Sequence, residues 1–250
     1  NCVLDLENLE VRQGLPEDMS TIKTDINFPL DVESDEAIEA FEIISDLLDK
    51  IYPLYDVQEY ILNIFAESLS GVQRRDKFHV HTGSGGNGKS VIFDLFGITF
   101  GEYCYTPDAT IYTFNLNNPN DVNPVTAGIK GVRSVFTGEQ KANTPFNTAN
   151  IKKLTGGDPI TGRHLRKDPI TFKPQASFHA CMNDIPQMDG PVDGGIERRM
   201  EIFEYPSKFV ASDNKKLLNP KKYPYYFPRN EKFRDEAFLR KLAPYFLRML

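Results

Sequence analysis

The feature that most constrains the fold is the segment at residues 83–90, which reads GSGGNGKS. Its spacing matches the pattern G-x-x-x-x-G-K-[ST], in which glycines let successive N–H groups turn toward phosphate oxygens. An alternating apolar run, Phe78–Thr82, precedes the segment, and a helical pattern over Lys89–Phe100 follows it. A helix that begins at this point adds the positive end of its dipole. The sequence therefore predicts a strand, a phosphate-binding loop and a helix in direct succession.

The loop predicts a site for ATP and Mg²⁺. The candidate nucleotide-binding residues are Gly83, Ser84, Gly85, Gly86, Asn87, Gly88, Lys89 and Ser90. The Lys89 ammonium suits the β- and γ-phosphates, and the Ser90 hydroxyl suits Mg²⁺. A glycine-rich turn with an incidental Lys-Ser pair is the alternative, and the strand and helix on either side of the segment argue against it.

Hydrolysis of a nucleotide needs further groups at the ends of neighbouring strands. The acid placed best is Glu139, which follows a strand predicted at 133–137 and would hold Mg²⁺ and orient water. Asn183 follows a strand predicted at 177–182 and suits a polar sensor of the nucleotide. Arg198 and Arg199 precede a strand predicted at 200–205, and either suits stabilisation of developing charge. Each signal is weak alone, but their order and their placement at strand ends favour a catalytic site.

The predicted strands alternate with helical segments, which favours an α/β fold of the P-loop NTPase class with a mainly parallel central sheet. Two amphipathic helices, at 31–50 and 57–69, precede the sheet. We therefore divide the chain into a lead-in and helical subdomain (1–70), an ATPase core (71–210), and a C-terminal loop and helix (211–250). The first residue is not Met and the last lies in a helical pattern, so we expect a fragment of a longer protein.

Charge is distributed unevenly along the 250 residues, which carry a net charge of −6. Residues 1–70 hold 17 acids and three bases, whereas residues 130–175 hold nine bases and three acids. A local basic zone matters more for nucleic-acid binding than the total charge. The three cysteines are far apart, which argues against a disulfide framework or a zinc knuckle and favours a reducing, intracellular compartment. No apolar run reaches the ~20 residues that span a bilayer, so no membrane contact is expected.

The basic zone contains a predicted hairpin. Its two strands are residues 160–161 and 170–172, and its tip carries Arg163, His164, Arg166 and Lys167. Such cations grip DNA phosphates without regard to base sequence and in a salt-dependent way. We therefore predict that the hairpin binds single-stranded DNA. The alternative is an exposed, charged hairpin that contacts nothing.

Two further features favour ordinary structural roles. His79 and His81 share one face of a strand, but no Cys or acid in register with them indicates a metal site. Residues 221–227 (KKYPYYF) interleave bases with aromatic side chains, as stacking platforms for single strands do. We prefer the interpretation that a proline-rich loop at 219–228 packs onto the core. A final helix is expected at 231–250.

The order of the motifs resembles the superfamily-3 helicases, in particular the primase–helicases of large DNA viruses of the poxvirus type. The resemblance rests on GSGGNGKS at 83–90, VRSVFTGEQ at 132–140, IKKLTGGDPITGRHLRKDPITFKP at 151–174, FHACMNDIP at 178–186 and GGIERRMEIF at 194–203. Residues 1–6 (NCVLDL) also resemble the lead-in that precedes the motor in this family. The LTGGDPIT run and the order of the blocks make the likeness specific.

The resemblance implies a modified AAA+ core that forms a hexameric ring, hydrolyses ATP between subunits and translocates on single-stranded DNA with 3′ to 5′ polarity. The roles it implies are phosphate binding by Lys89, Mg²⁺ binding by Ser90, a Walker B acid at Glu139, γ-phosphate sensing by Asn183, and an arginine finger at Arg199 in preference to Arg198. Many members of the family carry two adjacent acids at Walker B, whereas Gly138 precedes Glu139 here. The role of the second acid therefore stays open.

Two other classes of function remain open. A P-loop phosphotransferase acting on a small molecule would share the loop but would not need the basic hairpin or the arginine pair. A nucleotide-gated DNA-binding or assembly module with weak hydrolysis would suit the incomplete Walker B motif. The viral resemblance also implies a replication site in the host cytoplasm, with other replication proteins as partners and any primase activity outside this segment.

Overall fold

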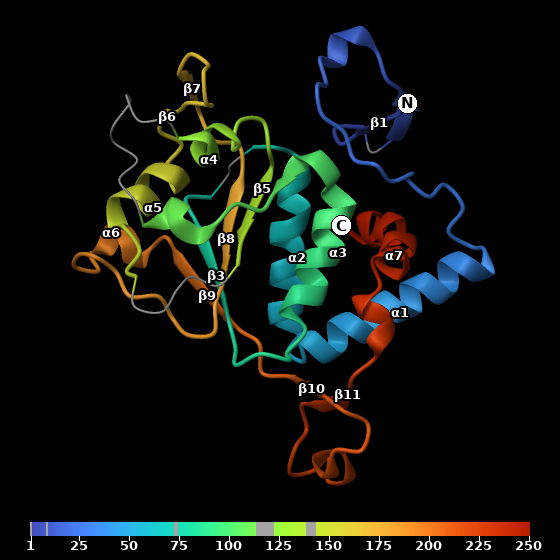
Figure 1. Cartoon of the computed structure of the whole chain (residues 1–250). Helices are drawn as coiled ribbons and strands as arrows, with labels where there is room; N and C mark the ends of the chain where they lie inside the picture. The colour runs from blue at the N-terminus through green and yellow to red at the C-terminus, as the bar shows by residue number, and fades with distance from the viewer. Residues whose placement is uncertain (1, 9, 73–74, 114–122, 139–143) are drawn as a thin grey trace.

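The computed structural model describes residues 2–8, 10–72, 75–113, 123–138 and 144–250. Its α-helices are α1 (Asp35–Ile51), α2 (Tyr55–Leu69), α3 (Lys89–Phe100), α4 (Pro124–Ala127), α5 (Thr148–Thr155), α6 (Gly194–Glu197) and α7 (Glu236–Met249). Its strands are β1 (Cys2–Asp5), β2 (Glu10–Gln13), β3 (Phe78–Thr82), β4 (Cys104–Tyr105), β5 (Ser134–Thr137), β6 (Ile160–Gly162), β7 (Ile170–Phe172), β8 (Ser177–Cys181), β9 (Met200–Glu204), β10 (Lys208–Val210) and β11 (Tyr226–Pro228). Figure 1 shows a central sheet with helices on both of its faces.

Five strands form the central sheet in the order β4-β5-β8-β3-β9, and every neighbouring pair is parallel. The strand that precedes the phosphate-binding loop, β3, lies between β8 and β9. Parallel strands place the carboxyl ends of β3, β5 and β8 at one edge of the sheet, which is where open α/β sheets bind ligands. The predicted fold class, an α/β fold like that of P-loop NTPases with a mainly parallel central sheet, is confirmed.

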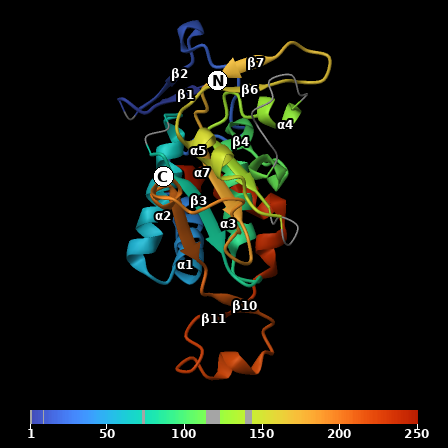
Figure 2. The same ribbon diagram turned by 90° about the vertical axis from the view of Figure 1, so that its left-hand side faces the viewer.

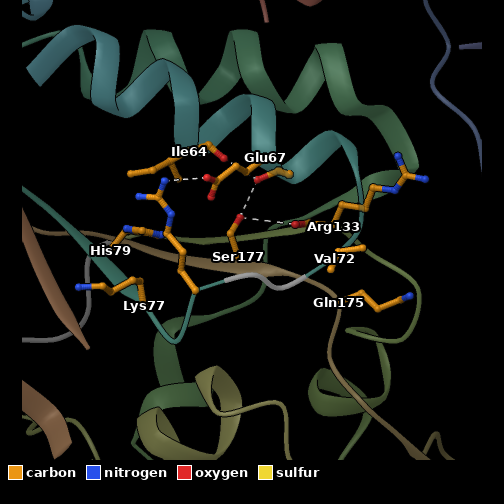
Figure 3. Close-up of a pocket in the computed structure, with 10 residues that line it drawn as sticks. Ile64, Glu67, Val72, Lys77, His79, Arg133, Gln175 and Ser177 are labelled. Atoms are coloured by element: carbon orange, nitrogen blue, oxygen red, sulfur yellow. Dashed lines mark hydrogen bonds and ion pairs between the residues drawn. The ribbon is translucent and has the colours of Figure 1, made fainter. Parts of the chain in front are cut away.

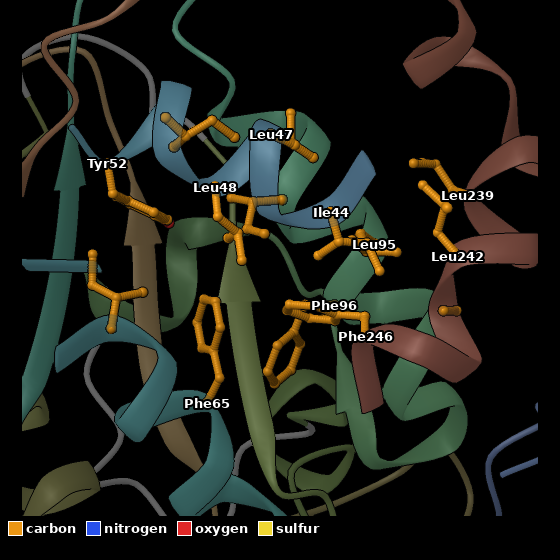
Figure 4. Packing of buried hydrophobic residues seen from close by; sticks show 14 of the residues in the cluster. Ile44, Leu47, Leu48, Tyr52, Phe65, Leu95, Phe96, Leu239, Leu242 and Phe246 are labelled. Carbon is orange, nitrogen blue, oxygen red and sulfur yellow. The ribbon is translucent and has the colours of Figure 1, made fainter. Parts of the chain in front are cut away.

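The sheet separates two hydrophobic cores. Phe78 and Val80 of β3 join Leu154 of α5 in the core on one face. On the other face, α1, α2, α3 and α7 pack together around side chains that include Phe65 and Phe246 (Figure 4). Full burial of a side chain of this size contributes roughly 1.5–3 kcal/mol. Burial of apolar side chains therefore fixes both layers of helices to the sheet. This packing also holds the ends of the strands in place.

Local signals set the ends of the helices. The Ser34 hydroxyl caps α1 by accepting a hydrogen bond from the Ala37 N–H at 3.3 Å. The helix predicted at 31–50 therefore begins at Asp35, one residue after this cap, and ends at Ile51. The helix predicted at Lys89–Phe100 is observed as α3 with the same bounds.

Two parts of the chain differ from the prediction. In the lead-in, where no strand was predicted, β1 and β2 pair in antiparallel. Residues 219–228 were expected to pack onto the core as a loop. They belong instead to a projecting segment, residues 208–230, which we call the arm and in which β10 pairs in parallel with β11 (Figure 1). Charged lysine side chains are rarely buried, so a lysine-rich composition favours a segment that projects into solvent.

The predicted basic hairpin is confirmed as β6 and β7. These strands pair in antiparallel, with Ile160 opposite Phe172 and Gly162 opposite Ile170. The hairpin and the arm lie at opposite ends of the molecule in both views (Figures 1 and 2). The final helix begins later than predicted, because a short 3₁₀ turn at Glu231–Arg234 precedes α7.

Candidate functional site

The phosphate-binding loop joins β3 to α3 through a backbone that glycine adopts most readily. Gly85, Gly86 and Gly88 have positive φ angles of 68°, 64° and 86°. At Gly88, an added Cβ atom would also lie 2.6 Å from Cγ1 of Ile51 at the end of α1. Glycine at this position is therefore required both by the backbone angle and by the close approach of α1.

The first part of the loop is held by contacts with Lys89 and with the end of β8. The Lys89 Nζ atom donates a hydrogen bond to the Gly83 carbonyl, and it lies 5.8 Å from the centre of the Tyr205 ring. The Gly83 N–H donates to the Asn183 carbonyl at 3.3 Å. The structure thus brings three of the predicted site residues together at the carboxyl end of β3.

The arm holds the rest of the loop. The Lys208 Nζ atom donates to the carbonyl and the hydroxyl of Ser84 at 2.7 Å each, and to the Gly85 carbonyl at 2.8 Å. The Phe209 N–H donates to the Gly86 carbonyl at 2.7 Å. Sequence reasoning missed both residues, because no local pattern relates them to a loop that lies 123 and 124 positions away.

The loop fits a nucleoside triphosphate with Mg²⁺. Ser84, Gly85, Gly86 and Ser90 are exposed, so phosphate and a hydrated ion can approach them. Asn87 is only 2 % exposed, and within the described part of the chain its Nδ2 atom has no hydrogen-bond acceptor. A buried donor without an acceptor costs about 1–3 kcal/mol. A phosphate oxygen in the loop would remove that cost.

The two predicted groups at strand ends have different outcomes. Asn183 follows β8 at the same sheet edge as the loop, which is the position predicted for a sensor. Glu139, the predicted Walker B acid, lies outside the described residues. The strand before it, β5, pairs with β8 and ends at Thr137, so its carboxyl end meets the same edge.

The two candidate arginines lie before β9, at the opposite edge of the sheet from the loop, and they differ in exposure. The Arg199 side chain is 10 % exposed and bonds the Thr155 hydroxyl at 3.2 Å and the Gly195 carbonyl at 2.8 Å. The Arg198 side chain is 66 % exposed. Asp76 faces both guanidinium groups, at 3.5 Å from Arg199 and 3.9 Å from Arg198. Arg199 is thus enclosed within its own chain, whereas Arg198 faces outward.

The predicted DNA-binding residues gather at the tip of the hairpin. His164, Arg166 and Lys167 are exposed, and Arg166 has a left-handed φ of 59°. The Arg163 side chain is half-buried, and its Nε donates to the Lys167 carbonyl at 3.0 Å. These four side chains form one cluster, which the fold keeps apart from the phosphate-binding loop.

A row of buried polar side chains crosses one face of the sheet. The Tyr52 and Tyr205 hydroxyls lie 2.7 Å apart, and Tyr205 contacts Nδ1 of His81 at 3.0 Å. His81 Nε2 contacts Nδ1 of His179 at 3.1 Å, and His179 Nε2 contacts the Ser177 hydroxyl at 3.0 Å. Burial lowers the pKa of both histidines well below its usual value, so both rings are neutral near pH 7. The row therefore supports the strands below the loop as a hydrogen-bonded part of the core.

A small hollow lies at the amino-terminal edge of the sheet, away from the phosphate-binding loop (Figure 3). Its volume is about 30 Å³, room for very few water molecules, and its lining includes Glu67, Arg75 and Arg133. Arg75 pairs with Glu67 at 2.7 Å, and Arg133 donates to the Leu69 carbonyl. Cations already bound in this way do not favour a ligand site.

In the parts of the chain with described structure, no group of three or more His, Cys, Asp or Glu side chains is arranged to hold a metal ion. Across those same parts, no helix combines the length and the apolar character needed to cross a bilayer.

Comparisons with known proteins find similar viral sequences. A profile described as "Family of unknown function (DUF5906)" matches residues 81–199. The protein named "Putative helicase L207/L206" of Acanthamoeba polyphaga mimivirus is 34% identical over 242 residues, which is 97% of this chain and 24% of that protein. "Putative helicase 121R" of Invertebrate iridescent virus 3 is 29% identical over 217 residues, 85% of this chain and 23% of that protein. The chain thus spans about a quarter of the length of these viral relatives.

Solved structures show a similar fold. The apo structure of the NrS-1 C terminal region superposes with a TM-score of 0.55 over 91% of this chain and 47% of that one, at 16% identity. At this identity the likeness concerns the fold alone. The chain therefore has a fold like that of P-loop NTPases, and its sequence is similar to a segment of several viral proteins with helicase names.

Proposed function

We propose that this chain is the motor portion of a DNA helicase, which binds ATP with Mg²⁺ and hydrolyses it to move along single-stranded DNA. The observation that carries the proposal is the GSGGNGKS loop at the carboxyl end of β3, with Lys89 and Asn183 hydrogen-bonded to its first glycine. The helicase names of the viral relatives support the same class.

In this proposal the chemistry is divided among residues at one sheet edge. Lys89 would hold the β- and γ-phosphates, and Ser90 would ligate Mg²⁺, whose charge would offset that of the phosphate oxygens. Asn183 contacts the γ-phosphate from the end of β8. Glu139, which lies outside the described residues, holds the ion and orients the attacking water.

The charge-stabilising arginine comes from a neighbouring subunit. The arginine pair lies at the amino-terminal end of the central strands, and the loop lies at their carboxyl end. Strand β3, which has five residues, spans roughly 15 Å between these two ends. This separation supports a ring in which one chain's arginine reaches the next chain's nucleotide, and the family resemblance suggests a hexamer. The exposure of Arg198 favours it over Arg199 for this contact.

The hairpin tip is the proposed contact with single-stranded DNA. Arg163, His164, Arg166 and Lys167 lie on one projecting turn, and six copies of it in a ring would surround a strand with positive charge. Contacts of this kind would be to phosphates and therefore independent of base sequence.

One experiment tests the proposal as a whole. We expect single-stranded DNA to stimulate ATP hydrolysis by the chain several-fold, and Lys89→Ala to reduce hydrolysis by roughly 100-fold or more. Lys241→Ala, which changes an exposed lysine on α7, should behave as wild type. If single-stranded DNA leaves the rate of ATP hydrolysis unchanged, or if phosphate passes from ATP to a small-molecule acceptor, a phosphotransferase is favoured instead.

A further inference from the structure

The contact between the arm and the phosphate-binding loop has no counterpart in the motifs that define the site. We propose that Lys208 is a positioning residue for the loop. It fixes the direction of the loop's peptide groups, so that their N–H groups are oriented for phosphate before ATP arrives. This inference rests on the proposed function of the loop as an ATP site.

The geometry of the peptide bond links the carbonyl contacts of the arm to the N–H groups of the loop. In a trans peptide, the C=O of one residue and the N–H of the next point in opposite directions. Lys208 holds the Gly85 carbonyl at 2.8 Å, and the Phe209 N–H holds the Gly86 carbonyl at 2.7 Å. The N–H groups of Gly86 and Asn87 therefore point away from the arm, as the inner donors of a phosphate-binding loop do.

Glycine makes such a brace necessary. Gly85 and Gly86 both have positive φ, and an added Cβ at Gly85 would meet nothing within 4 Å. A glycine peptide in open surroundings can rotate among several conformations, and fixing it costs about 1–2 kcal/mol per residue. Hydrogen bonds from a charged donor are stronger than those from a neutral one. The ammonium of Lys208 supplies three of them to two adjacent residues.

The arm holds Lys208 in this position. Lys208 opens β10 and lies opposite Tyr226 of β11, and its N–H donates to the Tyr225 carbonyl at 2.8 Å. On the far side of the strand pair, the Arg229 N–H donates to the Val210 carbonyl at 2.8 Å. The brace is therefore attached to a paired strand rather than to a free loop.

The test compares three variants of the whole chain. Lys208→Met should raise the dissociation constant for ATP roughly tenfold, with the melting temperature within about 2 °C of wild type. Lys208→Arg, which keeps the charge and the donors, should recover most of the affinity. Lys216→Met is the matched control, because it removes an arm lysine that bonds Tyr226 within the arm, and it should bind ATP as wild type does.

Calorimetric titration with ATP, together with separate KM and kcat values, decides the outcome. The proposal predicts a change mainly in KM, since the brace acts before the chemical step. It is overturned if Lys208→Met binds ATP as tightly as wild type, or if Lys216→Met loses as much affinity. If Lys89→Ala also keeps full affinity, the loop is not a nucleotide site and the proposed function fails as well.

An independent observation concerns charge on two separate surfaces. The arm carries six bases, Lys208, Lys215, Lys216, Lys221, Lys222 and Arg229, and one acid, Asp213. Residues 31–59 expose ten acids, Asp31, Glu33, Asp35, Glu36, Glu39, Glu42, Asp46, Asp49, Asp56 and Glu59. From these opposite charges we infer that the arm of one chain docks on α1 of a second copy, as part of the proposed ring.

Apolar side chains on both surfaces favour a protein partner over DNA. Ile38 is 47% exposed in the acidic stripe of α1, at helical spacing from Asp35 and Glu42, and Leu218 of the arm is 84% exposed. Interfaces between proteins typically combine an apolar centre with a charged rim. Stacking on single strands needs free aromatic faces.

The arm's aromatic rings are largely engaged within the arm itself. Tyr223 and Tyr226 pack against each other at 5.2 Å, and Lys216 lies over both rings. Phe227 packs on Phe209 at a centroid distance of 5.9 Å. This arrangement leaves few ring faces for bases, which is why a second copy of the chain is the preferred occupant.

Charge reversal tests the docking. The arm variant Lys215→Glu/Lys221→Glu/Lys222→Glu and the helix variant Glu39→Lys/Glu42→Lys/Asp46→Lys should each lower the assembled mass in sedimentation with ATP. A chain that carries both sets should regain assembly. Unchanged mass in either single set overturns the docking but leaves the ring intact, as does a loss of DNA affinity with unchanged mass. If the wild-type chain stays monomeric with ATP, both the proposed docking and the proposed ring are contradicted.

Discussion

The two edges of the central sheet differ in how their polar groups are bound. At the carboxyl edge, Lys89 and Lys208 hold carbonyl oxygens of the loop, while Ser84 to Gly86 remain exposed. At the amino edge, Arg199 and Glu201 are enclosed in hydrogen bonds and ion pairs with groups of their own chain. The first edge is open to a ligand, and the second is largely satisfied by the fold.

This difference is consistent with the proposal that one chain forms only part of a catalytic site. An arginine that already binds three groups of its own chain is not free to reach another molecule without losing them. Arg198 is the exception at the amino edge, because its side chain is mostly exposed and its contact with Asp76 is long at 3.9 Å. The comparison therefore separates a residue that stabilises the fold from a residue that can act on a partner.

The arginine pair gives the largest expected effect. If Arg198 enters a neighbouring site, Arg198→Ala should lower DNA-stimulated hydrolysis by roughly 10³-fold, as loss of a charge-stabilising arginine does. Its free energy of unfolding should stay within about 0.5 kcal/mol of wild type. Arg199→Ala should instead destabilise the fold by about 2–4 kcal/mol, because it leaves buried partners unsatisfied.

Urea denaturation and ATPase assays on the two variants separate these outcomes. Mixing Arg198→Ala chains with Lys89→Ala chains should restore part of the activity, because some interfaces would combine an intact loop with an intact arginine. Loss of activity at full stability in Arg199→Ala, with an active Arg198→Ala, would reverse the assignment and return the role to the residue preferred from sequence.

The residues at the carboxyl edge of the sheet, which is open to a ligand, were predicted from the sequence better than those at the amino edge. The loop, its strand and its helix are local in sequence, so glycine spacing and apolar periodicity locate them, and β3 and α3 have the predicted bounds. The hairpin of β6 and β7 was likewise predicted from a short segment. Local signals of this kind need no knowledge of the remaining chain.

Local signals could not predict contacts between segments that are far apart in the sequence. Lys208 meets Ser84 across 124 positions, and His81 meets His179 across 98. His81 was interpreted from sequence as a strand residue, and only the pairing of β3 with β8 and β9 shows its place in a buried hydrogen-bonded row. The arm was misplaced for a related reason, because base and aromatic content does not reveal whether a segment packs or projects.

The smallest expected effect concerns Glu201, on the closed edge. Burial by itself would raise the pKa of this carboxyl, but its polar contacts with His79, Lys77 and Tyr60 outweigh burial and lower the pKa to about 2. A carboxyl with a lowered pKa stabilises the fold fully above its unfolded value near 4.5, and this stability is lost as pH falls toward 2. Glu201→Gln should therefore cost about 1–3 kcal/mol at pH 7, and the difference from wild type should shrink between pH 4.5 and the acid limit.

Urea denaturation at several pH values measures this difference. Glu204→Gln, at the exposed end of the same strand, is the matched control and should change stability by less than about 0.5 kcal/mol. Since Glu201 belongs to the closed edge, its variant should keep wild-type ATP affinity while its stability falls. A difference that stays constant from pH 7 to pH 3 would contradict the ionic role of Glu201. A loss of ATP affinity without a loss of stability would break the comparison between the two edges, because it would place a nucleotide function on the side of the sheet that the fold has already satisfied.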